Sequence, residues 1–423
     1  YSPRFRHNNA FQSQTQLITL ASQQRYDFCS QRSSPNNLPR TRVSGSINTT
    51  KSLRGTSLKQ RVVRKLMLTL YQNWTCQFNE GLDTSDVANT SYVHMMKNVK
   101  LPVSGTTYRY AINPPLEKEK PYLLFLHGFP ETSYSWVNQI EYFTRRGYGI
   151  IAPDLLGTGG TDKPVKLEAY SLRTMASEIA ELLDCEGLDK VVAVSHDLGS
   201  FLISRFYTYQ SQYLSALAIL DIGYNAPGTD LNQTYVEAYN NYSQATFGYP
   251  VLGYWDYFDE PDAHVLLDAH LDSLYSLMYS SDTPKVMVEN FNTIGALQEW
   301  LAADRRAEFG NDFITNSTRE QWKTITRAQG GLEAGLKWYK SYLRGINSAD
   351  EDEIRSMSGV VEQPSLFIGA EKDSVGIPSE QLLSTLPFAP GMQIRTVSAG
   401  HFLHIEKADE VNEVLYSFIQ SLQ

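Results

Sequence analysis

Residues 191–200 read Val-Val-Ala-Val-Ser-His-Asp-Leu-Gly-Ser, and this stretch decides the fold. Its first four residues have the β-branched and small side chains of a short buried strand. Two small residues, Ser195 and Gly199, stand two places on either side of Asp197. That spacing is typical of a strained strand-to-helix elbow, because larger flanking side chains would clash and the central side chain is exposed at the tip. An aspartate at the tip predicts an alkyl-ester intermediate rather than an acyl-serine.

The same pentapeptide also fits an aspartate that caps a helix N-terminus. Motifs after other predicted strands favour the elbow. The apolar run 121–126 leads into His-Gly-Phe-Pro, where such a fold has its second oxyanion donor. Asp373 follows a predicted strand at 365–369, and His401 follows another that ends at Val397. The chain order is therefore nucleophile, acid and histidine, as in an α/β-hydrolase triad. The sequence contains no Gly-x-Ser-x-Gly motif, which argues against an ordinary esterase.

Charge is unevenly distributed along the 423 residues, whose formal net charge is −9. Residues 1–79 contain 12 Lys and Arg and a single acid, whereas residues 80–423 carry a net charge of −20. This acidic body has no basic stripe to neutralise phosphates, which argues against nucleic-acid binding. The hydrophobic content of 42% is enough for a large core. No apolar stretch reaches the roughly 18 residues that a membrane span needs.

The cysteines and the first residues bear on the location of the protein. Cys29, Cys76 and Cys185 are too few and too scattered for a disulfide framework or a metal site, so we expect a reducing compartment. Residues 1–60 are rich in Ser, Thr, Asn, Gln and Arg, which predicts disorder. The same composition also fits an organelle transit peptide, or upstream sequence that was included because the start of the protein was placed too early. We expect a cytoplasmic protein, with organelle import through 1–60 as the alternative.

Predicted strands alternate with predicted helices in the rest of the chain. Such alternation implies an α/β fold with a mostly parallel sheet covered by helices on both faces. The predicted strands are 96–101, 106–112, 121–126, 149–152, 191–195, 216–221, 365–369 and 393–397, and the predicted helices are 133–146, 171–186, 199–210, 378–386 and 408–422.

An insertion interrupts this rhythm between the predicted strands 216–221 and 365–369. It is rich in Tyr, Trp, Asp and Asn, with helical patterns at 233–245, 263–279, 286–301 and 332–342. An insertion of this size between sheet strands is expected to form a helical cap that closes the site against water. The predicted organisation is a disordered or leader segment at 1–81, a first core part at 82–222, the cap at 223–358 and a second core part at 359–423.

Five segments together resemble the epoxide hydrolases of the α/β-hydrolase fold, which are close relatives of the haloalkane dehalogenases. Most of residues 85–423 share the resemblance. The segments are the oxyanion segment His127-Gly-Phe-Pro-Glu-Thr-Ser-Tyr-Ser-Trp, the acid loop Ala370-Glu-Lys-Asp, the histidine loop Gly400-His-Phe, and the cap motifs Gly253-Tyr-Trp-Asp-Tyr-Phe-Asp-Glu-Pro and Lys337-Trp-Tyr-Lys.

The resemblance implies a role for each motif residue in converting an epoxide to a vicinal diol. Asp197 is the implied nucleophile, and Tyr254 and Tyr339 are the implied hydrogen-bond donors to the epoxide oxygen. His401, oriented by Asp373, is implied to activate water. The backbone N–H groups of Phe129 and Leu198 are the expected oxyanion hole, and the side chains expected to line the substrate pocket are Trp136, His196, Tyr257 and Trp338. The expected ligands are an apolar epoxide and water, without a metal or organic cofactor; the oligomeric state stays open.

Alternatives remain at several positions. Asp350 or Asp352 could supply the acid, although neither follows a predicted strand, and Tyr257 could replace Tyr254. The family usually has Trp after the nucleophile, but this chain has Leu198. Because leucine offers no donor to a leaving halide, a haloalkane dehalogenase or another hydrolase with an aspartate nucleophile is the second hypothesis. A non-catalytic ligand receptor is the third.

Overall fold

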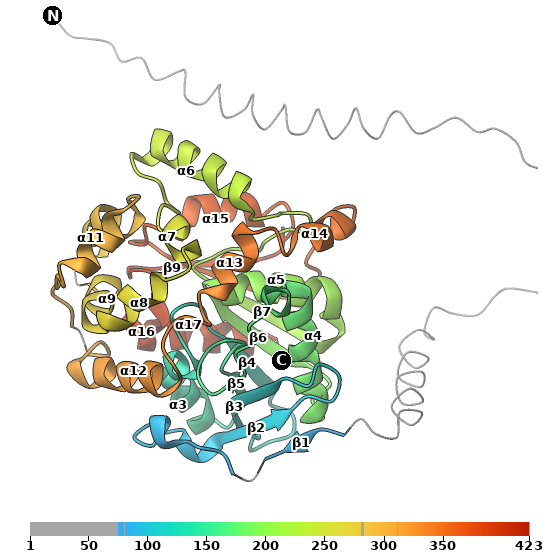
Figure 1. Cartoon of the computed structure of the whole chain (residues 1–423). Coiled ribbons are helices and arrows are strands. Elements are labelled where there is room, and N and C mark those ends of the chain that lie inside the picture. Colours follow the sequence, from blue (N-terminus) through green and yellow to red (C-terminus); the bar gives the residue numbers. More distant parts are fainter. Residues whose placement is uncertain (1–74, 80, 281–282, 311, 423) are drawn as a thin grey trace, which may run out of the picture. The chain divides into compact units, whose positions relative to one another are not determined.

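The computed structural model describes residues 75–79, 81–280, 283–310 and 312–422, and Figure 1 shows how their helices and strands are arranged. The disordered or leader segment expected at 1–81, with the alternative of organelle import through 1–60, lies outside the described residues except for its last few positions. Within the described part, no helix combines the length and the apolar character that crossing a membrane requires.

Nine strands of the described residues form one sheet in the order β1-β2-β3-β5-β4-β6-β7-β8-β9. The first three strands are antiparallel, and the six from β5 to β9 run parallel. Their bounds are β1 (Gln77–Phe78), β2 (Met96–Lys100), β3 (Thr107–Asn113), β4 (Tyr122–Leu126), β5 (Gly149–Pro153), β6 (Val191–His196), β7 (Leu214–Leu220), β8 (Ser365–Ala370) and β9 (Gln393–Val397). Every strand predicted from the sequence is present within two residues, and only the short edge strand β1 was not predicted.

Helices cover both faces of the sheet, as the alternation of elements predicts. The bounds of the core helices are α3 (Val137–Arg145), α4 (Leu172–Cys185), α5 (Leu198–Gln210), α15 (Pro378–Thr385), α16 (Leu403–Glu406) and α17 (Ala408–Gln420). One hydrophobic cluster joins α4 and α5 to the sheet through side chains such as Leu182 and Leu202. A second cluster joins α3 and α17 to the opposite face, with Phe143 and Leu415 among its members. Burial on both faces explains why β6 is apolar at consecutive positions.

A helical cap is inserted between β7 and β8. Figure 1 shows its helices, coloured yellow-green to orange, grouped beside the sheet. They are α6 (Gln233–Phe247), α7 (Trp255–Asp259), α8 (Ala263–Ala269), α9 (Leu271–Met278), α10 (Thr283–Met287), the π-helical turn η6 (Val288–Asn292), α11 (Ala296–Ala302), α12 (Asn316–Ala328), α13 (Lys337–Leu343) and α14 (Ser348–Ile354). Short 3₁₀ turns are η1 (Ser85–Val87), η2 (Val93–Met95), η3 (Ser133–Trp136), η4 (Leu167–Tyr170) and η5 (Ser211–Tyr213).

The cap helices differ from the sequence prediction more than the core elements do. The helix predicted at 263–279 is divided at His270, and the one predicted at 286–301 is divided before α11 by Gly295, whose φ is 80°. A glycine in this left-handed conformation ends one helix and allows the next to start in a new direction. The helices α7, α12 and α14 were not predicted, and α13 begins five residues later than the predicted 332–342.

Hydrogen bonds between cap side chains and core loops fasten the cap. The indole N–H of Trp322 donates to the Pro130 carbonyl oxygen at 2.9 Å. In the same way, Trp338 Nε1 donates to the Leu156 carbonyl at 2.8 Å. On the other side of the cap, Ser374 Oγ donates to Asn292 Oδ1 at 2.9 Å, linking η6 to the loop after β8. The bonds reach three separate core loops, so the cap is held at several points of its underside.

A disulfide corrects the expectation that the cysteines are unpaired. Cys76 and Cys185 are bonded, their Cα atoms lie 5.7 Å apart, and they are 109 residues apart in sequence. The bridge joins the residue before β1 to the last residue of α4. Spacing in sequence could not reveal it, because only the fold brings these two elements together. Persistent disulfides are rare in reducing compartments, so the expected cytoplasmic location loses the argument that the cysteines gave it.

Candidate active site

Asp197 lies at the tip of a strained turn between β6 and α5. Its φ of 50° and ψ of −125° are unusual for a residue with a side chain, as a strand-to-helix elbow requires. A Cβ atom at Gly199 would overlap the carbonyl oxygen of Leu126 in the neighbouring strand, and one at Gly128 would overlap the Asp197 carboxylate. The two glycines therefore allow the elbow to pack against β4 and the oxyanion segment.

His401 and Asp373 lie beside this turn, from the loops after β9 and β8. The Nε2 atom of His401 is 3.5 Å from Asp197 Oδ2, and its Nδ1 atom is 2.9 Å from Asp373 Oδ2. All three side chains are at least nine-tenths buried. Burial opposes ionisation of Asp373, but the neighbouring imidazole and hydrogen bonds outweigh it and hold the pKa of Asp373 well below its ordinary value. An ionised Asp373 fixes the ring so that Nε2 faces the nucleophile.

Asp221 is a third buried acid at this site that the sequence analysis missed. Its Oδ2 atom is 2.8 Å from His401 Nδ1, and its side chain is fully buried. Burial, reinforced by the charge of Asp373, raises the pKa of Asp221 well above its ordinary value. One signal was available: Asp221 is the last residue of the predicted strand 216–221, and Asp197 and Asp373 come shortly after two other predicted strands. Asp350 and Asp352, the alternatives for the acid, instead lie on α14 at the protein surface, where Asp350 pairs with Arg173.

Of the two N–H groups expected to form the oxyanion hole, that of Phe129 reaches an oxygen of Asp197. The N–H of Phe129 donates to Asp197 Oδ1 at 2.9 Å. Leu198 is the first residue of α5, so its N–H group has no carbonyl acceptor within the helix. Both N–H groups therefore belong to backbone next to the carboxylate. Neither depends on a side chain, so Leu198 in place of Trp leaves this part of the site unchanged.

Two cap tyrosines face Asp197 across the site. Tyr254 and Tyr339 line the same cavity as Asp197, and their ring centroids are 6.1 Å apart. Burial raises the pKa of both phenols, and the charge of Asp197 raises it further, so both are protonated donors at neutral pH. Tyr257, the alternative to Tyr254, points elsewhere: its hydroxyl group donates to the Ala263 carbonyl oxygen at 3.1 Å. The structure therefore favours Tyr254 as the first cap tyrosine.

The cavity over Asp197 encloses about 370 Å³, part of it open solvent. Its wall is mainly aromatic and aliphatic, and the lining residues are Phe129, Pro130, Asp197, Tyr254, Phe258, Leu274, Met278, Met287, Phe291, Tyr339, Val375, His401 and Phe402. The rings of Phe258 and Tyr339 pack edge to face with centroids 4.9 Å apart. A small apolar electrophile with one hydrogen-bond acceptor fits this lining best, because the polar atoms are confined to the nucleophile, the histidine and the phenols.

None of the four side chains expected to line the substrate pocket lies on the wall of this cavity. Trp136 is fully buried against Phe125, and Trp338 uses its indole N–H to hold the Leu156 carbonyl. Tyr257 bonds to the cap backbone, as described above. His196 lies behind the elbow, fully buried. The motifs located the right segments, but which side chain of a segment faces the cavity depends on how that segment packs in the fold.

His196 belongs to a buried polar cluster behind the site. Its Nδ1 atom is 3.0 Å from Glu131 Oε2, and its Nε2 atom is 2.8 Å from the carbonyl oxygen of His401. His404 Nε2 lies 3.2 Å from the other oxygen of Glu131. Glu131, His196 and His404 are close enough together to offer three ligand atoms to one metal ion. Both nitrogens of His196 are already engaged, however, so a metal ion would have to replace the contact between His196 Nδ1 and Glu131.

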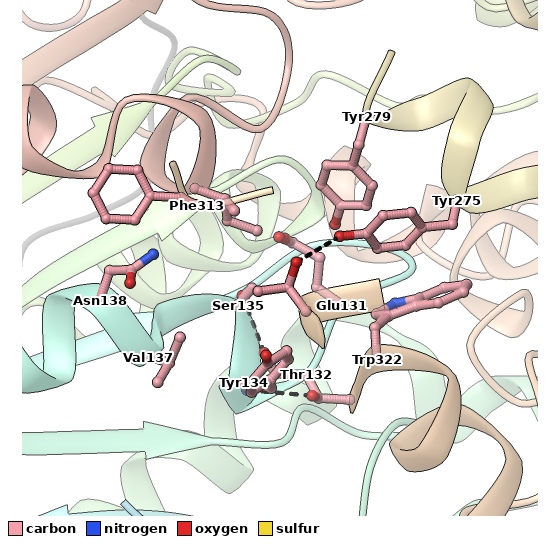
Figure 2. Close-up of a pocket in the computed structure, with 12 residues that line it drawn as sticks. Glu131, Thr132, Tyr134, Ser135, Val137, Asn138, Tyr275, Tyr279, Phe313 and Trp322 are labelled. Carbon is pink, nitrogen blue, oxygen red and sulfur yellow. Dashed lines mark hydrogen bonds between the residues drawn. The ribbon is translucent and has the colours of Figure 1, made fainter. Parts of the chain in front are cut away.

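A second cavity of about 490 Å³, part of it open solvent, lies on the other side of α9. Figure 2 shows Tyr275 from this helix and Tyr279, the residue that follows it, facing Glu131, Tyr134 and Trp322. Leu274 and Met278 of the same helix line the first cavity instead. Although the second cavity is larger, it contains neither the nucleophile nor the histidine. We therefore place the candidate chemistry in the smaller one.

Comparison with known proteins supplies a family. Residues 121–408 match the family described as the alpha/beta hydrolase fold. Bifunctional epoxide hydrolase 2 of Mus musculus is 25% identical over 306 residues, which are 71% of this chain and 52% of the mouse protein. Epoxide hydrolase A of Mycobacterium tuberculosis is 24% identical over 327 residues, 73% of this chain and 92% of that protein. The chain thus spans about half the length of the mouse relative and nearly all of the bacterial one.

Solved structures agree on the fold. The crystal structure of Epoxide Hydrolase A from Mycobacterium thermoresistibile superposes with a TM-score of 0.62 at 24% identity, covering 78% of this chain and 98% of that one. An epoxide hydrolase from an endophytic Streptomyces gives a TM-score of 0.62 at 21% identity, covering 77% and 95%. At these identities the superposition establishes the shared architecture.

Proposed function

The chain belongs to the α/β-hydrolase fold family, and we propose that it is an epoxide hydrolase, which converts an epoxide to a vicinal diol. One observation carries the proposal: an aspartate, not a serine, occupies the elbow, with an imidazole on one side and two cap phenols on the other. A carboxylate nucleophile forms an alkyl ester with a strained electrophile. The names of the relatives support the same activity.

Ring opening is the first step. A carboxylate oxygen of Asp197 attacks the less hindered epoxide carbon, and the bond from that carbon to the ring oxygen breaks. The electron pair of that bond moves to the ring oxygen, where Tyr254 and Tyr339 donate hydrogen bonds and one of them gives its proton. The raised pKa values keep both phenols protonated until this moment. The product is a hydroxyalkyl ester of Asp197.

Ester hydrolysis is the second step. His401 Nε2 takes a proton from water, and the resulting hydroxide attacks the ester carbonyl carbon. The N–H groups of Phe129 and Leu198 hold the oxyanion that forms there. The bond between the carbonyl carbon and the alkoxy oxygen then breaks, and this leaving oxygen takes the proton from His401. The second proton of the water is released when Asp197 ionises, and it restores the tyrosine.

Mass spectrometry of the trapped ester tests both steps. With styrene oxide, His401→Gln should accumulate a covalent adduct whose added mass equals that of the epoxide, because ring opening does not need the base. Asp197→Asn should form no adduct and no diol. His94→Gln is the matched control, since His94 is exposed and remote from the cavity, and it should turn over like the parent. An unmodified His401→Gln protein after prolonged incubation contradicts the two-step scheme.

The same assays separate the other two hypotheses. Release of halide from haloalkanes without diol formation from epoxides would identify a dehalogenase. Leu198 argues against it, because its side chain has no donor for a leaving halide. Ligand binding that survives in Asp197→Asn, together with a parent protein that turns over no epoxide, would identify a receptor.

A further inference from the structure

Asp221 is a buried acid for which the two-step scheme has no use. It follows β7, and its φ of 67° puts it in the left-handed conformation that few residues with side chains adopt. Its carboxyl oxygen approaches His401 Nδ1 to 2.8 Å, as closely as Asp373 does at 2.9 Å. A Cβ atom at Gly376 would overlap its carboxyl group, so the acid loop packs directly on it. Strain and burial of this kind persist only where the surroundings require them.

The hydrogen-bond donors around the two acids are distributed unequally. Asp373 accepts from the Val375 N–H at 2.9 Å, from the Gly376 N–H, and from His401 Nδ1. Neither carboxyl oxygen of Asp221 has a donor among the described residues that points at it. An ionised Asp221 would therefore be a buried charge without a hydrogen bond, which is strongly unfavourable. A protonated Asp221 has an acceptor at hand in Asp373, because an oxygen of each acid lies within 2.9 Å of the same atom, His401 Nδ1.

We propose that Asp221 is a protonated carboxylic acid that donates its hydrogen to Asp373, so that the two acids share one negative charge and together position His401. Two carboxyl groups this close to one ring nitrogen cannot both ionise without strong repulsion. The proposal deepens the function proposed above and rests on it. Asp221 acts through Asp373 and His401, so it is a positioning residue and touches no substrate.

The arrangement gives the histidine a reserve acid. If Asp373 loses its charge, Asp221 has no acceptor for its proton; the proton leaves to solvent, and the ionised Asp221 accepts the hydrogen of His401 Nδ1 in its place. No bond of the ring changes, because Nδ1 keeps its hydrogen throughout. Other ionisable groups near the ring include Asp197, at 3.5 Å from Nε2, and His196, whose ring centroid is 4.9 Å away. Neither of them lies within reach of a direct bond to Nδ1.

A double-mutant cycle on ester hydrolysis tests the reserve. Removing the only acid of a serine–histidine–aspartate triad lowers kcat by about 10⁴. Here Asp373→Asn alone should lower the rate of ester hydrolysis by only about 10–10², and Asp221→Asn by less, whereas the double variant should lose about 10³–10⁴. Asp268→Asn is the control, because Asp268 is a half-buried cap acid bonded to the Leu332 N–H, far from His401. An Asp373→Asn loss as large as that of the double variant overturns the proposal.

Infrared spectroscopy reads the proton directly. The parent should show the carbonyl stretch of a buried protonated carboxylic acid at neutral pH, and Asp221→Asn should lose it. Asp373→Asn should lose it as well, because Asp221 then ionises, while Asp268→Asn should retain it. A parent without this band refutes the shared proton even if folding is intact. If the parent forms no ester with any epoxide, the proposed function fails, and the infrared measurement still decides on the acid pair.

Discussion

The negative charge of Asp197 is present before ring opening and absent from the ester, and this difference acts on His401. Burial opposes a charge on the imidazole, but the negative charge of the Asp373–Asp221 pair outweighs it and raises the pKa of His401 well above its ordinary value. Asp197, 3.5 Å from Nε2, adds to the increase. Esterification removes the contribution of Asp197. The pKa of His401 therefore falls at the step at which the ring has to accept a proton from water.

The cap tyrosines can be separated by removing one hydroxyl group at a time. Tyr339→Phe should slow ring opening by about 10²–10⁴ if Tyr339 gives its proton to the epoxide oxygen. Stopped-flow measurement of ester formation in the His401→Gln background isolates that step. Tyr257→Phe is the control, because its hydroxyl group bonds to the Ala263 carbonyl outside the cavity. Equal rates for Tyr339→Phe and Tyr257→Phe would leave Tyr339 with a packing role only.

Short elements behind the site link its parts, and α16 is one of them. The helix begins two residues after His401, and its His404 lies against Trp136, with ring centroids 4.4 Å apart, and beside Glu131. Burial lowers the pKa of His404 to about 4, although the neighbouring Glu131 opposes this. At neutral pH the ring is therefore uncharged. Packing of α16 on the oxyanion segment depends on that neutral state.

Stability should therefore decrease as the pH falls from 6.5 towards 4. In this window an unfolded chain protonates His404 and the folded protein does not, so the unfolded state binds more protons and is favoured. The contribution amounts to about 3 kcal/mol at its limit. Urea unfolding should show that His404→Gln loses less free energy of unfolding over this window than the parent does. His94→Gln, at an exposed position, should follow the parent; a parent-like slope for His404→Gln would contradict the assignment.

The core strands could be predicted from the sequence because burial on both faces leaves continuous apolar runs, as in Val191–Val194. The cap could be predicted only in outline. Its helices break at positions such as His270, where no proline or glycine marks the end. Trp136, His196 and Trp338 lie in correctly located segments but point away from the cavity, because side-chain direction follows from tertiary packing. Asp221 was missed for a related reason: a single acid after a strand forms no motif until the fold brings it to His401.

At the scale of the molecule, the Cys76–Cys185 bridge ties the first described strand to the helical layer. It closes a loop of 109 residues around β1 to β5 and α4. A covalent link of this length restricts the unfolded chain strongly. β1 is a two-residue edge strand with both residues exposed, so it has little packing of its own to hold it. The bridge therefore supplies an attachment that hydrophobic contacts do not.

Removing the bridge should lower stability without touching the cavity. Cys76→Ser should decrease the free energy of unfolding by about 2–4 kcal/mol. Thermal unfolding with and without a reducing agent provides the measurement: the parent should lose stability on reduction, and Cys76→Ser should respond little. Cys29→Ser is the control, because it leaves the bridging pair intact. A parent whose Tm ignores the reductant would show that the two cysteines are not bonded in solution.

The attachment of the cap has a consequence for how molecules enter and leave the cavity. Three different core loops are each bonded to one cap residue, which is Trp322, Trp338 or Asn292. The cap therefore cannot open as a rigid body without breaking all of these bonds. Entry and exit must then depend on brief displacement of individual rings along the passage. A narrow diol would dissociate quickly, whereas a wide one would dissociate slowly. The width of the product, more than its polarity, would set the rate of product release and so the time before the next substrate binds.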